Sequence, residues 1–149
     1  SCSAEVRQGR VGVYPTGVWH RAEELKFFVC DNSALDSFVL SERAEAKAKP
    51  REVVLPVNSI DRIVSELRLD RIDFIKMDVE GAERNALTGA QATLAKYRPR
   101  LSIATENLPD DQHAVPPLVL KAWDGYRQQC GRCSLTERGT IQPDVVFLY

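Results

Sequence analysis

Four ionisable side chains cluster in the segment Phe74–Glu83, which reads FIKMDVEGAE. An apolar run gives way there to a helical pattern, and ligands of open α/β sheets bind at the carboxyl ends of such strands. Asp78 would stand at the strand tip, with Glu80 just beyond it. Gly81 would let a ligand or the backbone approach closely. The segment therefore suits proton transfer or the binding of a polar ligand.

A structural interpretation of the same residues is equally available. Acidic residues are common at helix N-termini because they stabilise the unpaired N–H groups and the helix dipole there. Glu83 fits that role, and Lys76 could simply pair with a neighbouring carboxylate. Taken alone, the cluster leaves the functional and the structural interpretation open.

The elements around the cluster have clear periodicity. Ile72–Met77 is almost continuously apolar, which predicts a strand buried on both faces of a parallel sheet. The stripe of Ala86, Ala90 and Leu94 predicts one helix over Glu80–Tyr97, which ends before Pro99. A second strand follows at Leu101–Ala104. A right-handed crossover would make the two strands adjacent and parallel.

Upstream, stretches rich in Val, Phe and Tyr predict two neighbouring strands at Val11–Val18 and Leu25–Cys30. In the second strand, alternation predicts that Leu25, Phe27 and Val29 form the more buried face. The polar run Ser41–Arg51 predicts a solvated loop or lid. Asn58 would cap a helix that ends near Leu69.

Downstream, the pattern changes from alternation of strand and helix to a pair of strands. The segments expected there are a polar loop at Glu106–His113, a helix at Pro116–Trp123, and strands at Tyr126–Cys130 and Val145–Leu148. Two closing strands predict an antiparallel finish to the sheet. The fold class expected is α/β in a single domain over residues 1–149.

Composition limits the classes of partner. The 149 residues are 44% hydrophobic, enough for one core, and 20 basic against 21 acidic residues give a net charge of -1. Such a balance predicts no nucleic-acid partner. No apolar run approaches the ~20 residues that cross a bilayer, so no membrane association is expected. The oligomeric state is left open.

Cysteine usage favours a reducing, cytoplasmic setting. The four cysteines are too few and too irregularly spaced for a disulfide scaffold. Cys130 and Cys133 have the spacing of a zinc or redox pair, but neither a second pair nor a nearby His accompanies them. We interpret them as ordinary thiols beside a turn.

The run that begins at Val54 closely resembles the C-terminal signature of FkbM methyltransferases. Leu55 is its one variation from that signature. The family phrase has the form F-I-K-x-D-V-E-G-A-E, then L-x-G-A, then R-P and a strand. Here it corresponds to Phe74–Glu83, followed by Leu87-Thr-Gly-Ala90 and by Arg98-Pro99. The resemblance implies a Rossmann-like class I methyltransferase sheet and S-adenosylmethionine as cofactor. It also implies methyl transfer to a hydroxyl of a small molecule, either a sugar or a natural product.

One family feature is missing from the sequence. Members open their catalytic domain with a D-x-G-A-N-x-G type loop and a second strand whose terminal acid binds the ribose. None of the 8 glycines here stands in such a loop. The resemblance thus implies an N-terminally incomplete sheet that begins just before the third strand, in a fragment or a naturally truncated protein.

The resemblance assigns provisional roles around the strand tips. Asp78 would accept a proton from the acceptor or orient the methionine end of the cofactor, with Lys76 as a catalyst or as the partner of one. Gly17 and Val18 would lie near the adenine. The remaining candidates are Glu80, for a catalytic, substrate or helix-cap role; Glu83, for substrate or helix cap; Glu106 and Asn107, for substrate; and His113, as a base at the substrate or a surface residue.

Three alternatives remain beside this hypothesis. Asp78, Glu106 and Asn107 could together bind a divalent metal that lowers the pKa of the substrate hydroxyl. A nicotinamide oxidoreductase would share the crossover, but the missing G-x-G-x-x-G fingerprint argues against it. A degenerate scaffold or interaction module without activity would explain the missing glycine loop.

Overall fold

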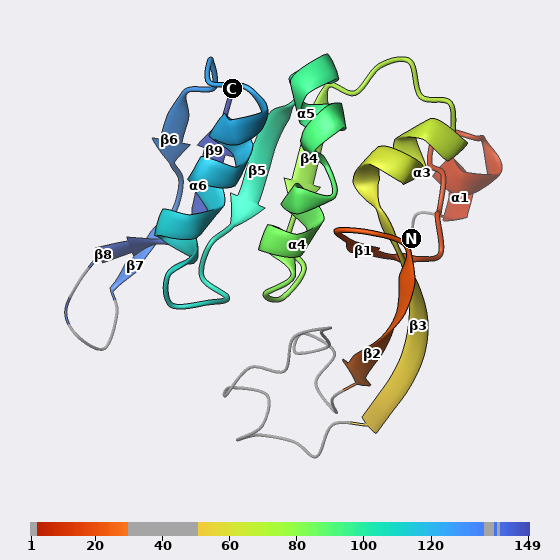
Figure 1. Ribbon diagram of the computed structural model, residues 1–149, viewed down its shortest axis with the longest axis horizontal. Coiled ribbons are helices and arrows are strands. Elements are labelled where there is room, and N and C mark those ends of the chain that lie inside the picture. Colours follow the sequence, from red (N-terminus) through yellow and green to blue (C-terminus); the bar gives the residue numbers. More distant parts are fainter. Residues whose placement is uncertain (1–2, 30–50, 136–138, 140) are drawn as a thin grey trace.

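The computed structural model describes residues 3–29, 51–135, 139 and 141–149. The predicted loop at Ser41–Arg51, apart from Arg51, lies outside the described residues, as do Cys2 and Cys30. The described chain forms two mixed sheets and a hairpin, and the order of elements along the chain is shown in Figure 1. The class is therefore α/β, with both parallel and antiparallel pairing.

The N-terminal part forms a three-stranded sheet in the order β1-β3-β2, preceded by a short helix. Its elements are α1 (Ser3–Arg7), β1 (Gly17–Trp19), β2 (Glu23–Val29) and β3 (Arg51–Ser59). β1 is parallel to β3, and β2 is antiparallel to it. The prediction of a strand over Val11–Val18 was largely wrong. The two predicted strands are not neighbours either, because β3 lies between them.

Strand β3 was not predicted, because Pro56 lies inside it and proline has no N–H group for a ladder. The structure accommodates Pro56 where β3 has a single neighbour. β1 pairs with β3 only from Val57 onward, whereas Glu24 of β2 lies opposite Pro56. The carbonyl of Pro56 also accepts a hydrogen bond from the hydroxyl of Thr16 at 2.9 Å.

Helix α3 (Ile60–Glu66) follows β3 directly. Its N-cap is Ser59, whose hydroxyl accepts a hydrogen bond from the Arg62 N–H at 3.2 Å. The predicted cap, Asn58, lies one residue earlier and accepts instead from the N–H of Ser59. The helix ends before the predicted Leu69, where Arg68 takes a left-handed conformation with φ of 52°.

The second sheet has the order β4-β5-β9-β6. Its strands are β4 (Phe74–Met77), β5 (Arg100–Ala104), β6 (Gln128–Cys130) and β9 (Val145–Leu148). β4 and β5 are parallel neighbours, which confirms the predicted crossover. β9 is antiparallel to both β5 and β6, which confirms the antiparallel finish.

Helices α4 (Glu83–Thr88), α5 (Gln91–Tyr97) and α6 (Asp111–Ala122) lie on one face of this sheet (Figure 1). The core lies between these helices and the strands. The predicted stripe of Ala86, Ala90 and Leu94 is fully buried in it, which confirms that face of the helical region.

The prediction of one helix over Glu80–Tyr97 was wrong, because the chain breaks into α4 and α5 at Gly89. A Cβ atom on Gly89 would lie 2.2 Å from the carbonyl oxygen of Trp19, so β1 packs against the backbone there. The N-terminus of α5 is capped from another helix. Both carboxylate oxygens of Asp61 accept hydrogen bonds, from the N–H groups of Ala92 at 3.1 Å and Thr93 at 2.7 Å. Contacts from the N-terminal part thus divide the helix.

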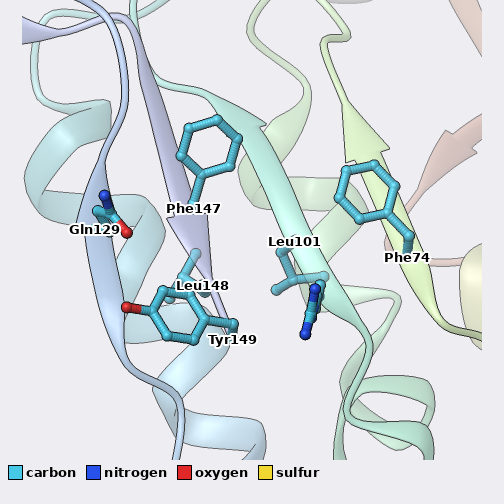
Figure 2. A pocket seen from close by; sticks show the side chains of 7 residues that line it. Phe74, Leu101, Gln129, Phe147, Leu148 and Tyr149 are labelled. Carbon is cyan, nitrogen blue, oxygen red and sulfur yellow. The ribbon is translucent and has the colours of Figure 1, made fainter.

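The other face of the second sheet is partly open, contrary to the predicted burial of β4 on both faces. Phe74, Phe147 and Tyr149 are 56%, 39% and 51% exposed on this face. They line a pocket of about 370 Å³. Figure 2 shows their side chains. The residues of β4 that do pack toward the helices are Ile75 and Met77. Among the described residues, one side of the sheet is therefore buried and the other carries exposed aromatic rings.

The C-terminal elements differ from prediction in their limits. α6 begins at Asp111 rather than near Pro116. The buried Asp111 carboxylate accepts a hydrogen bond from the N–H of Leu108 at 2.9 Å and closes the turn that precedes the helix. β6 is shorter than the predicted strand from Tyr126. A hairpin of β7 (Cys133–Leu135) and β8 (Ile141–Pro143) was not foreseen. No helix in the described part of the chain has the length and apolarity needed to span a membrane.

Candidate functional site

The candidate site lies where β4 and β5 end side by side. The strands are in parallel register, with Met77 opposite Ile103, so the residues that follow them leave the same edge of the sheet. Asp78 follows β4 directly, and Thr105, Glu106 and Asn107 follow β5. Asp78 therefore occupies the strand tip that the sequence predicts.

Asp78 is an exposed carboxylate with one exposed cationic partner. The Nζ atom of Lys76 lies 3.3 Å from its Oδ2 atom, and the two side chains are 67% and 48% exposed. An ion pair so open to water adds little to stability. Asp78 is thus placed at the edge of the fold without being part of its packing.

The backbone after Asp78 turns through two left-handed residues before α4 begins. Glu80 has φ of 49° and Gly81 has φ of 96°. Glycine takes this conformation freely, whereas a non-glycine residue there is strained. The predicted start of the helix at Glu80 was wrong for this reason, and Gly81 lies in the turn before the helix.

Glu83 is a buried carboxylate whose partners all lie inside the protein. Its Oε1 atom accepts hydrogen bonds from the Val79 N–H at 2.9 Å and from Nδ2 of Asn107 at 2.8 Å. Its Oε2 atom accepts from the Gly81 N–H at 2.9 Å. Burial raises the pKa of Glu83 above its ordinary value, and the hydrogen bonds from Val79 and Asn107 offset part of that effect.

A mostly apolar cavity of about 390 Å³ opens beside the end of β4. Its walls come from the N-terminal segment, α3 and β4, and include Val18, Ile63, Ile75, Lys76, Met77 and Val79. The cavity thus brings predicted cofactor residue Val18 together with Lys76, the partner of Asp78. Gly17 is the neighbour of Val18 in β1 and pairs with Val57.

The other predicted residues are spread around the sheet edge. Glu106 is exposed, Asn107 is half-buried with its amide on Glu83, and His113 is exposed in the first turn of α6. No group of three or more His, Cys, Asp or Glu side chains within the described residues is arranged to hold a metal ion. Cys130 and Cys133 are exposed and form no disulfide.

Sequence reasoning missed the links between α4 and the start of α6. Arg84 donates from Nε to the fully buried carboxylate of Asp111 at 2.7 Å and also pairs with Asp110. The signal available was an arginine directly after Glu83 together with the acidic pair at 110 and 111. Nothing in their spacing indicated that they meet.

Comparison with known proteins agrees with this arrangement of motif and fold. The family described as the methyltransferase FkbM domain matches residues 3–130. The chain belongs to the FkbM methyltransferase family. The FkbM motif Phe74–Glu83 lies wholly inside the matched region. No curated protein matches the chain.

A solved structure supports the fold. The crystal structure of methyltransferase FkbM from Methylobacillus flagellatus KT is similar to this FkbM chain with a TM-score of 0.65 and 20% sequence identity. The similarity covers 99% of this chain and 31% of that chain. The chain thus spans about a third of that protein's length, and at this identity the likeness concerns the fold alone.

Proposed function

We propose that this chain forms part of an S-adenosylmethionine-dependent methyltransferase that methylates a hydroxyl oxygen of a sugar or natural product. The observation that carries the proposal is the family match, which spans the motif at the tip of β4. The parallel crossover and the cavity beside the strand tip are consistent with it.

The cavity fits part of the cofactor. Its volume of about 390 Å³ falls within the range of small-molecule sites, roughly 300 to 1,000 Å³. Its apolar wall, which includes Val18, Ile63 and Ile75, suits a purine ring. No carboxylate of the described residues lines it, so a ribose diol would lack its usual partner. The described residues therefore fit the adenine better than the rest of the molecule.

S-adenosylmethionine would supply an electrophilic methyl group on a positively charged sulfur. In our proposal Asp78 accepts the proton that the substrate hydroxyl loses as its oxygen is methylated. Its exposure leaves room for an acceptor, and the Nζ atom of Lys76 lies 3.3 Å from its Oδ2 atom.

We further infer that the chain supplies the C-terminal part of a Rossmann-like class I sheet. Among the described residues β4 is an edge strand, and one face of its sheet carries exposed rings. The sequence has no cofactor-binding glycine loop. The same absence favours a second candidate function, that of a scaffold without catalytic activity.

Two protein samples would test the proposal. One is this chain, and the other is the chain extended by the sequence encoded immediately before Ser1. Each is incubated with S-adenosylmethionine and a panel of sugars and hydroxylated natural products, and S-adenosylhomocysteine is measured. We expect acceptor-dependent release with the extended protein. Cofactor binding without release for any acceptor would favour the scaffold.

A further inference from the structure

The buried carboxylate of Glu83 accepts hydrogen bonds from other groups of the protein. It has no exposed surface, and each of its three hydrogen-bond partners is a donor: two backbone N–H groups and the amide of Asn107. A side chain with no exposed surface cannot contact a substrate. Its role must therefore act through the groups that it holds.

Glu83 does not act as an ordinary helix cap. A capping side chain bonds to N–H groups in the first turn of its own helix. Glu83 is the first residue of α4, yet its oxygens reach back to Val79 and Gly81, which precede the helix. The cap position, Ala82, makes no side-chain hydrogen bond. The carboxylate thus holds the turn before the helix.

The turn that Glu83 holds has a conformation that needs support. Glu80 and Gly81 are both left-handed, and Gly81 is buried, so its N–H group cannot turn to water. A buried N–H without an acceptor is strongly unfavourable. Because the Glu83 carboxylate supplies the acceptors for Val79 and Gly81, the shape of the turn depends on it.

The same residue joins the two loops of the candidate site. Asn107, three residues beyond Ala104 at the end of β5, donates to the Oε1 atom that also accepts from Val79. The neighbouring residue, Arg84, reaches the same loop by its bonds to Asp110 and Asp111. Two consecutive side chains of α4 therefore fix the loop after β5 to the loop after β4.

We propose that Glu83 is a positioning residue, which sets the turn that carries Asp78 and locks it to the loop after β5 through Asn107. Asp78 pairs with the exposed Lys76, and the next residue along the chain, Val79, is the one whose N–H group Glu83 holds. Val79 also lines the cavity beside β4. The consequence for catalysis rests on the proposed function, whereas the hold on the turn does not.

Amide hydrogen exchange of the 15N-labelled chain tests the hold on the turn. Glu83→Gln replaces one acceptor oxygen by an NH₂ group that faces an N–H donor. We expect exchange at Val79 and Gly81 to accelerate at least 10-fold, with exchange at Ile103 in β5 unchanged. Glu24→Gln, at an exposed position in β2, is the matched control and should change none of the three.

A second variant keeps the test decisive if Glu83→Gln does not fold. Asn107 is only half-buried, so Asn107→Ala should fold, and we expect it to accelerate exchange at Val79 at least threefold. Unchanged exchange at Val79 and Gly81 in the folded variants would overturn the proposal. So would an equal acceleration at Ile103, because Glu83 would then serve stability alone.

The effect of Glu83 on catalysis is measured separately from hydrogen exchange. In an extended protein that transfers methyl groups, Glu83→Gln should lower kcat at least 10-fold and change KM by less than threefold, since Glu83 touches no ligand. An unchanged kcat would overturn the positioning role. A parent protein with the expected exchange pattern but no methyl transfer would overturn the proposed function and leave the hold on the turn intact.

Discussion

Asp78 and Glu83 belong to one motif, but they differ in their exposure to solvent and in their hydrogen-bond partners. Asp78 is half exposed beside Lys76, whereas Glu83 is buried and bonded to backbone N–H groups. Carboxylates placed in such different environments take different chemical roles. The exposed one is available to a substrate, and the buried one is available only to the protein.

Replacing Asp78 tests its assignment as the proton acceptor. In an extended protein that transfers methyl groups, Asp78→Asn should reduce turnover on the order of 100-fold, the range of lost acid–base catalysis. Because the side chain is exposed, the free energy of unfolding should change by about 0.5 kcal/mol or less. Asp73→Asn, before β4 and also exposed, is the control. Turnover near that of the parent would make Asp78 structural.

The pH dependence of stability should reveal the buried Glu83. Its folded-state pKa is raised above the ordinary 4.5, mainly by burial, with a smaller effect in the same direction from Asp111. The stabilisation from this group is therefore present below the unfolded-state pKa and is lost as pH rises through the folded-state pKa. Urea unfolding from pH 4 to 7 should show this loss in the parent and not in Glu83→Gln. Parallel curves for the two proteins would contradict the shift.

At the scale of elements, Gly89 is a position where the helical region after β4 packs closely against β1. A Cβ atom there would meet the carbonyl of Trp19, the Cα of His20 and the side chain of Ser59 within 3.0 Å. Gly89→Ala should therefore cost about 1 to 3 kcal/mol of unfolding free energy, as overpacking does. Chemical denaturation measures it. Gly12→Ala, where nothing lies within 4 Å, should change stability little; equal effects would disprove the close packing.

Local periodicity accounts for what the sequence predicts correctly. The apolar runs at β4, β5 and β9 and the stripe through Ala86 and Leu94 depend on neighbours along the chain. The division of the helix at Gly89 could not be predicted, because it depends on β1, about seventy residues earlier. β3 was missed because a proline within a run of residues argues against a central strand. At Pro56, however, β3 has a neighbouring strand on one side only.

The candidate site was predictable to a similar extent. The place of Asp78 follows from the end of an apolar strand, and the structure agrees. The interior role of Asn107 did not follow, because a residue after β5 can face solvent or the neighbouring loop with the same sequence pattern. The bond to Glu83 exists only because the turn before α4 brings that carboxylate under the loop.

At the scale of the whole molecule, the missing glycine loop predicts weak cofactor binding by this chain alone. Each lost hydrogen bond to a polar ligand group is worth about 0.5 to 1.5 kcal/mol, so several would weaken a micromolar ligand to the millimolar range. Calorimetry at ~100 μM S-adenosylmethionine should then show no saturable binding. A low-micromolar dissociation constant would mean that other residues, or a second copy, rebuild the site.

One of the two tryptophans lies in the N-terminal sheet, and the other follows α6, which packs on the second sheet. Trp19 lies in β1, and Trp123 packs edge-on against Tyr126 at 5.0 Å with the guanidinium of Arg98 over its ring. One fluorophore thus reports on the N-terminal sheet and the other on the core beside the second sheet. In Trp19→Phe and Trp123→Phe, the urea midpoint from fluorescence should coincide with that from far-UV circular dichroism, because Gly89 and Asp61 couple the two parts. Separate midpoints would mean that the sheets unfold as independent units.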